Sequence, residues 1–115
     1  MIITFDIDGT ICSQSNPDYE NAQPFFEKIE VINKLYYEGH TINFFTSRFM
    51  GRTNSDIKKV YEIGYDFTYN QLKNWNIKFH NLYMGKPMYD FFIDDKFIDY
   101  KDDWELRILK IIEKG

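Results

Sequence analysis

The chain has 115 residues and a net charge of −4, with 43% hydrophobic and 28% charged residues. This length supports one compact domain and leaves too little core for a second. The composition is that of a soluble globular protein; without a basic stripe or a long apolar stretch, neither nucleic acid nor a membrane is an expected partner.

The chain contains a single cysteine, Cys12, so an internal disulfide is impossible. This usage fits a reducing compartment, and we expect a cytoplasmic protein. Cys12 is expected to be a small loop residue and not a nucleophile, because nothing near it in sequence would lower its pKa.

The first half of the chain is predicted to alternate strands and helices. Residues 2–7 are apolar and run into Asp-Gly-Thr, which predicts a buried strand followed by a turn and not a signal peptide. Residues 12–23 are polar and loop-like. Residues 24–36 carry apolar side chains at helical spacing behind a proline that suits a first turn, and residues 41–45 form a second apolar strand.

Two further helices are predicted between residues 53 and 75. Thr53-x-x-Asp56 resembles a capping box with Asp in place of Glu, and Gly64 can end the helix that it opens. Thr68-x-x-Gln71 resembles a second capping box, which predicts the start of another helix.

The last part of the chain predicts two more strands and a final helix. Residues 79–84 form a third strand, residues 91–93 a fourth, and residues 104–112 an amphipathic helix. Strands separated by helices indicate an α/β fold with a parallel sheet covered on both faces. We therefore expect residues 1–115 to form one Rossmann-like, three-layer domain.

Polar residues gather just after each predicted strand. They are Asp6, Asp8, Gly9 and Thr10 after the first strand, Thr46, Ser47 and Arg48 after the second, Lys86 after the third, and Asp94 and Asp95 after the fourth. In open α/β sheets, ligands bind beyond the carboxyl ends of the strands. The sequence therefore predicts one site supplied by four separate segments.

The residue types at this edge suit phosphoryl transfer. Clustered carboxylates need a cation or protons, and hard oxygen ligands suit Mg²⁺, which also binds a phosphate oxygen. A carboxylate can attack phosphorus to form an aspartyl-phosphate, while a hydroxyl and a lysine hold the other phosphoryl oxygens. A second carboxylate two residues on can act first as acid and then as base.

Asp6-Ile-Asp8-Gly9-Thr10, then Thr46, Lys86 and Asp94-Asp95 resemble the four ordered motifs of the haloacid dehalogenase superfamily of phosphatases. The resemblance runs from Met1 to about Trp104. It implies that Asp6 is the nucleophile and a Mg²⁺ ligand. It implies that Asp8 is the general acid and base, with its carbonyl also reaching the metal. Asp at position 8 points to phosphate-ester hydrolysis, since the ion-pumping and dehalogenase branches lack it.

The same resemblance implies roles for the other matched positions. Thr46 would bind the phosphoryl group, and Lys86 would neutralise charge on Asp6 and on the phosphate. Asp94 would complete the metal site, with Asp95 as a further ligand, as a partner behind the ligands, or paired with a neighbouring cation. We expect the strand order 3-2-1-4, which places the first and fourth strands side by side and brings Asp6 and Asp8 against Asp94 and Asp95.

Forty residues separate Asp6 from Thr46 and forty separate Thr46 from Lys86, and predicted elements fill both intervals. The chain therefore resembles a capless member with an open site. Capless members commonly act on large substrates or use a neighbouring subunit as a lid, so a homo-oligomer is compatible with the resemblance. Three sequence segments, TSR, QLKNWNIKFHNLYMGKP and FIDDK, are similar to segments of small bacterial members linked to capsule or surface-polysaccharide biosynthesis. This similarity suggests a phosphorylated sugar or glycan intermediate as substrate.

Several roles stay open at this point. Ser47, Arg48 and Arg52 are candidate contacts for a substrate anion, and Asp99 either supports Lys86 or caps the last helix. The loop over residues 12–23 is long enough to shape specificity. Tyr19 and Phe49 are candidates for a substrate-facing wall, although neither belongs to a motif.

Three rival functions remain. A phosphatase that acts on a nucleic-acid end is compatible with an open site, but the net negative charge does not favour it. A phospho-receiver domain shares the fold class and a similar set of residues, but it accepts phosphate on an Asp after its third strand. Here that strand ends in Tyr83-Met84-Gly85, which argues against a receiver. A degenerate, binding-only protein of the same fold would keep the architecture without turnover.

Overall fold

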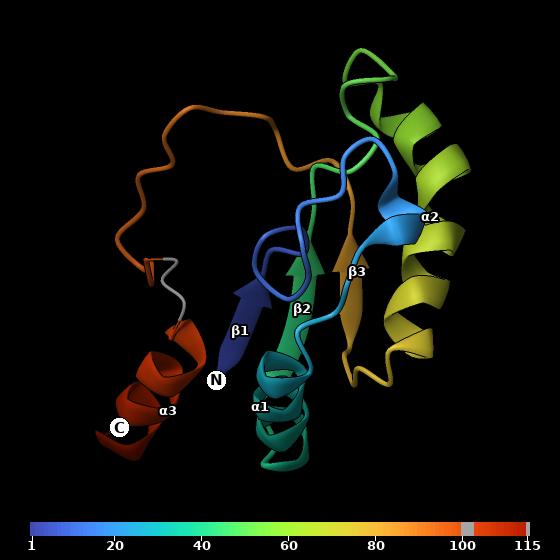
Figure 1. Cartoon of the computed structure of the whole chain (residues 1–115). Coiled ribbons are helices and arrows are strands. Elements are labelled where there is room, and N and C mark those ends of the chain that lie inside the picture. The colour runs from blue at the N-terminus through green and yellow to red at the C-terminus, as the bar shows by residue number, and fades with distance from the viewer. Residues whose placement is uncertain (100–102, 115) are drawn as a thin grey trace.

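The computed structural model describes residues 1–99 and 103–114. Its centre is a parallel sheet of three strands in the order β1-β2-β3, over Ile2–Phe5, Thr41–Phe45 and Asn81–Tyr83 (Figure 1). Ile3 pairs with Ile42, and Phe44 pairs with Leu82. The α/β class and the adjacency of the first three strands agree with the prediction from sequence.

Three helices accompany the sheet: α1 over Phe26–Tyr37, α2 over Ile57–Asn74 and α3 over Trp104–Lys114, with a short 3-10 turn at Tyr19–Asn21. The apolar stripe of α1 buries Ile29, Ile32 and Leu35. The core forms where this stripe meets the sheet face that carries Phe5, Ile42 and Phe44. No helix in the described part of the chain is long and apolar enough to cross a membrane.

Helix α3 is held against the beginning of the chain. The Trp104 ring lies 5.2 Å from the Phe5 ring, and its Nε1 donates to the Thr10 carbonyl at 3.0 Å. On the α1 side, Lys28 Nζ lies 2.8 Å from a carboxylate oxygen of Glu105, and both side chains are largely buried. These contacts join the C-terminal helix to β1, to the turn that follows it and to α1.

The second face of the sheet is mostly open, which differs from the predicted three layers. Its side chains alternate with the core residues, and Ile2 is 75% and Tyr83 48% exposed. The start of α2 borders this face, where Ile57 and Tyr61 help to line an open hollow of about 520 Å³ with Phe45 and Tyr83. Successive right-handed crossovers from β1 to β2 and from β2 to β3 place α1 and α2 on the same side, so the other side receives no crossover helix.

Residues 57–74 form one continuous helix where the sequence predicts two. Asp56 caps this helix by accepting from the Lys59 N–H. The helix therefore begins at Ile57, about one turn after the Thr53 that the first capping pattern indicated. Gly64 does not end the helix, because it is the point at which the buried Phe49 ring packs against it. The pattern at Thr68 lies inside the helix, where that side chain is fully buried.

Gly64→Ala is expected to destabilise the protein by about 1 kcal/mol or more, although Ala is the better helix former. An added Cβ would lie 2.8 Å from Phe49 Cε2, and this buried ring is already packed against Tyr19 at 4.9 Å. Urea unfolding measures the change. Gly51→Ala is the matched control, since no atom lies within 4 Å of a Cβ there; equal stability of the two variants would contradict the prediction.

The predicted fourth strand, residues 91–93, is not paired with the sheet. Figure 1 shows the chain leaving β3 at the carboxyl edge of the sheet and arching away from it before it descends to α3. Phe91 is 89% and Ile93 96% exposed. The apolar run over residues 91–93 is the basis of the strand prediction, and this segment lies outside the sheet. The order 3-2-1 is therefore present in the described residues without a fourth member.

Candidate functional site

Asp6 and Lys86 come together at the carboxyl edge of the sheet. Asp6 follows the last residue of β1, and Lys86 follows β3. The Lys86 ammonium lies 3.7 Å from Asp6 Oδ1, and the Asp6 side chain remains 37% exposed. The Lys86 N–H donates to the Thr46 carbonyl at 3.1 Å, which fixes the lysine backbone beside the end of β2.

The environment of Asp6 disfavours its charged form. Burial raises the pKa of Asp6 above its ordinary value of 3.8, the attraction of Lys86 opposes this rise, and the neighbouring Asp8 carboxylate adds to it. A half-exposed carboxylate with a raised pKa next to a lysine is the kind of group found in functional sites.

The raised pKa of Asp6 predicts a pH-dependent cost to folding. A group whose pKa rises on folding stabilises the folded state below its unfolded pKa, and this contribution is lost as the pH rises through the folded value. Asp6→Asn removes the cost, so with chelator present its urea midpoint should exceed that of wild type at neutral pH. The difference should shrink as the pH falls through the raised folded-state pKa and vanish below the ordinary carboxyl pKa of 3.8. A lower midpoint for the variant at neutral pH would mean that the attraction of Lys86 outweighs burial.

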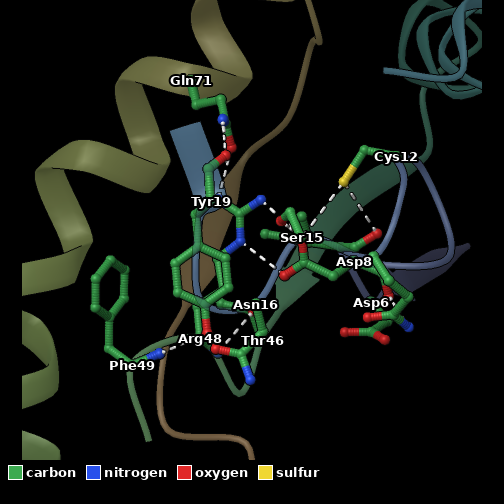
Figure 2. A network of polar contacts seen from close by, with 12 residues as sticks. Asp6, Asp8, Cys12, Ser15, Asn16, Tyr19, Thr46, Arg48, Phe49 and Gln71 are labelled. Atoms are coloured by element: carbon green, nitrogen blue, oxygen red, sulfur yellow. Dashed lines mark hydrogen bonds and ion pairs between the residues drawn. The ribbon is translucent and has the colours of Figure 1, made fainter. Parts of the chain in front are cut away.

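Asp8 is held by Arg48, which reaches it from the segment after β2. Arg48 Nε and Nη2 donate to Asp8 Oδ2 and Oδ1 at 2.8 and 2.9 Å, and the Arg48 side chain is fully buried (Figure 2). Arg48 Nη1 donates to Gln71 Oε1 on α2 at 2.6 Å. Arg48 was expected to contact a substrate anion; instead its guanidinium faces Asp8 and is not exposed to solvent.

The loop over residues 12–23 folds back against Asp8. Ser15 Oγ donates to Asp8 Oδ1 at 2.9 Å. The Tyr19 ring stacks on the Arg48 guanidinium at 4.8 Å, and its carbonyl accepts from Gln71 Nε2 at 2.7 Å. Tyr19 and Phe49 are both buried, so they do not form the substrate-facing wall that was a candidate from sequence.

Cys12 lies inside this network as a buried thiol. Its Sγ is 3.6 Å from Asp8 Oδ1 and 3.7 Å from the Ile7 carbonyl. Burial, followed by the negative charge of Asp8, raises the pKa of Cys12 to about 12. The thiol is therefore protonated at neutral pH, in agreement with the expectation that it is not a nucleophile.

Thr46 and Ser47 occupy the turn at the end of β2. Thr46 is buried, and its Oγ1 accepts from the Arg48 N–H at 3.1 Å. Its N–H donates to the Tyr83 carbonyl at 3.0 Å. Ser47 is half-buried, and its carbonyl accepts from Met50. Thr46 thus stands between the Asp6–Lys86 pair and the Arg48–Asp8 pair.

Asp94 and Asp95 are not brought to Asp6 in this arrangement. Both lie in the exposed segment after β3, where Asp94 Oδ1 accepts from the Lys96 N–H at 2.9 Å. This hydrogen bond lowers the pKa of Asp94, and a hydrogen bond with the Asp95 side chain lowers it further by a smaller amount. Asp99 is also exposed, and its backbone carbonyl accepts from Arg107. The carboxylate that lies near Lys86 is that of Asp6.

Of the predicted metal ligands, Asp6 and Asp8 lie just after the end of β1. Within residues 1–99 and 103–114, no three acidic, His or Cys side chains converge closely enough to hold a metal ion. Mg²⁺, however, keeps several waters and needs only one or two carboxylates beside a substrate phosphate. The half-exposed Asp6 carboxylate and the Asp8 carbonyl, which accepts one long bond of 3.5 Å from Gln14, fit such a minimal site.

Sequence reasoning missed Ser15 as a partner of Asp8 and Gln71 as a partner of Arg48. Ser15 sits in a polar loop without a motif, and Gln71 had been interpreted as part of a helix cap. The helical spacing of the residues around Gln71 was the only available signal, because it places that side chain on the face that α2 turns toward residues 19 and 48.

Comparison with known proteins yields a structural likeness and no family. Neither a protein-family model nor a curated protein matches the chain. A crystal structure of an MCSG target from Vibrio cholerae superposes with a TM-score of 0.79 at 21% identity, covering 96% of this chain and 98% of that one. At this identity the likeness shows a shared fold, and it extends over nearly the whole chain.

Proposed function

We propose that the chain is a Mg²⁺-dependent phosphomonoester hydrolase that acts through an aspartyl-phosphate on Asp6. The observation that carries the proposal is the Asp6–Lys86 pair, 3.7 Å apart at the carboxyl edge of the sheet. Asp6 is the acidic side chain that is half-exposed there, and Lys86 supplies the positive charge that a transferring phosphoryl group needs. Asp8 stands two residues away with an oxygen available for proton transfer.

The reaction proceeds in two displacements. An Asp6 oxygen bonds to phosphorus as the bond to the leaving oxygen breaks, and Asp8 gives that oxygen a proton. Water then bonds to phosphorus, the bond from phosphorus to Asp6 breaks, and Asp8 takes the water proton. Lys86 and the Thr46 hydroxyl hold the phosphoryl oxygens in both steps. Mg²⁺, held by Asp6 and the Asp8 carbonyl, would supply further charge neutralisation.

The proposed fold includes a fourth strand and no cap. β1 has β2 on one side only, so its other edge offers unpaired backbone groups in the described residues. Phe91 and Ile93 are β-prone, exposed and immediately precede Asp94. Pairing of residues 91–93 with β1 would give the order 3-2-1-4, would bury these side chains and would carry Asp94 to the end of β1, with Asp95 beside it.

Asp94→Asn is expected to raise the Mg²⁺ concentration for half-maximal activity by about 10-fold or more, because a ligand carboxylate is lost. A Mg²⁺ titration of phosphatase activity measures this. Asp90→Asn is the matched control, since it removes an exposed charge from the same segment. Equal titration curves for both variants would contradict the fourth strand and leave Asp94 outside the site.

The proposed substrate is a phosphorylated sugar or glycan intermediate of surface-polysaccharide biosynthesis, acted on in the cytoplasm. The amino-acid sequences of the motifs support this class of substrate, and the half-exposed Asp6 is compatible with a bulky leaving group. The test is phosphate release from sugar phosphates, nucleotides and simple esters, with Mg²⁺ and with chelator. Mg²⁺-dependent release is expected; a chain that releases phosphate from no ester would instead fit the binding-only alternative.

A further inference from the structure

Arg48 is the largest fully buried side chain of the described residues, at 1% exposure. Its guanidinium is fixed from three directions: by the Asp8 carboxylate, by Gln71 Oε1 at 2.6 Å and by the Tyr19 ring at 4.8 Å (Figure 2). A buried, planar cation of this kind has little freedom to turn toward a ligand. Its position is therefore set by α2 and by the loop at Tyr19, and Arg48 in turn sets the position of Asp8.

The two oxygens of Asp8 are used unequally. Oδ1 accepts from Arg48 Nη2 and from Ser15 Oγ, both at 2.9 Å, with the Cys12 thiol at 3.6 Å. Among residues 1–99 and 103–114, Oδ2 accepts only from Arg48 Nε, at 2.8 Å. A carboxylate oxygen has two lone pairs, so Oδ2 keeps one lone pair that no described group occupies.

We propose that Arg48 is a positioning residue for Asp8, which it holds so that Oδ2 is the oxygen that gives and takes the proton. This inference rests on the proposed function and reassigns Arg48, which was expected to bind the substrate phosphate. The bidentate pair fixes the plane of the carboxylate, and the additional donor lies on Oδ1, so the unused lone pair is on Oδ2. A lysine could not fix that plane, because its ammonium is a single point charge.

The role predicts a specific kinetic signature. Proton donation to the leaving oxygen matters most when that oxygen is strongly basic, as in an alkyl or sugar alkoxide. It matters little for 4-nitrophenolate, which leaves readily as an anion. A loss of Asp8 positioning should therefore lower kcat/KM for an alkyl phosphate more than for 4-nitrophenyl phosphate. Because Arg48 does not touch the phosphate, inhibition by inorganic phosphate should not change.

The experiment compares wild type, Arg48→Met and Arg48→Lys in saturating Mg²⁺. For Arg48→Met, kcat/KM for the alkyl ester is expected to fall about 100-fold, the lower range of a general acid's contribution. The fall for the aryl ester should be about 10-fold smaller than for the alkyl ester, as expected when leaving-group protonation is the step that suffers. Arg48→Lys should recover only part of the loss, and the inhibition constant of inorganic phosphate should stay at the wild-type value in both variants.

Two further variants guard against a simple loss of folding. Ser15→Ala removes the second donor to Oδ1 from a half-buried loop position and should show the same dependence on the leaving group, more weakly. Lys73→Met is the matched control, because it removes an α2 cation that stacks on the Tyr69 and Phe79 rings and does not contact Asp8. Urea midpoints of all variants accompany the kinetics.

The outcomes separate the inference from the function on which it rests. Equal losses for both esters in folded Arg48 and Ser15 variants would overturn the positioning role. A raised inhibition constant for inorganic phosphate would overturn it as well, and would return Arg48 to the substrate. Wild type that releases phosphate from neither ester would overturn the proposed function together with this inference.

Discussion

Asp6→Asn should reduce phosphate release by about 10³-fold or more while the protein stays folded, because the amide cannot attack phosphorus. Asp6 is the half-exposed carboxylate beside Lys86, and Asn keeps its size and shape. The measurement is kcat on the preferred ester in Mg²⁺, with the purified variant shown by circular dichroism to be folded.

The control for Asp6→Asn is Asp66→Asn, which changes an exposed carboxylate on α2 in the same way. This control should keep the wild-type rate. Acid-quenched protein incubated with substrate should carry phosphate on wild type and none on Asp6→Asn. Substantial turnover by the Asp6 variant, after removal of contaminating phosphatase, would refute Asp6 as the nucleophile.

Trp104→Ala should lower the free energy of unfolding by about 3–5 kcal/mol, as is typical for removal of a buried Trp. The ring packs on Phe5 at the end of β1, lies 5.7 Å from the Lys28 ammonium, and donates to the Thr10 carbonyl. Such a loss is a large part of the stability of a small domain, which is about 5–15 kcal/mol. Urea unfolding followed by circular dichroism measures it.

Leu106→Ala is the comparison for Trp104→Ala, because this apolar residue lies on the same helix but is 56% exposed. It should unfold within about 0.5 kcal/mol of wild type, as surface substitutions do. If the two variants unfold alike, α3 does not pack on the start of the chain as described. Weakened activity of Trp104→Ala at temperatures where it is folded would link this packing to the turn that carries Asp8.

The position of Asp6 could be predicted from sequence because two local rules decide it. An apolar run predicts β1, and a parallel sheet brings the carboxyl ends of its strands to one edge. The same rules place Lys86 after β3, and the 3.7 Å contact between the two side chains agrees with them. Residues 91–93 satisfy the same local rule for a strand, yet they stand outside the sheet in this structure. An apolar run shows that a strand is possible, while pairing depends on which edge the chain can reach.

The partner of Asp8 could not be predicted, since it depends on how distant segments meet. The sequence predicts the correct edge for Arg48, but the direction of its side chain is set by Gln71 and Tyr19. Gln71 follows Arg48 by 23 residues and lies in α2, and Tyr19 lies in the loop that precedes α1. The local pattern predicts a helix cap at Gln71, because it carries no sign that the helix continues through Gly64, where an aromatic ring packs on it.

The sequence by itself determined the α/β class, the direction of the strands and the collection of acidic and basic residues at one edge, because strand and helix periodicity and chain order are local properties. Only the tertiary structure decided that Arg48 is buried against Asp8, that α2 is a single helix and that one sheet face stays open. Each of these depends on contacts between residues far apart in the chain, for which neither propensity nor spacing carries information.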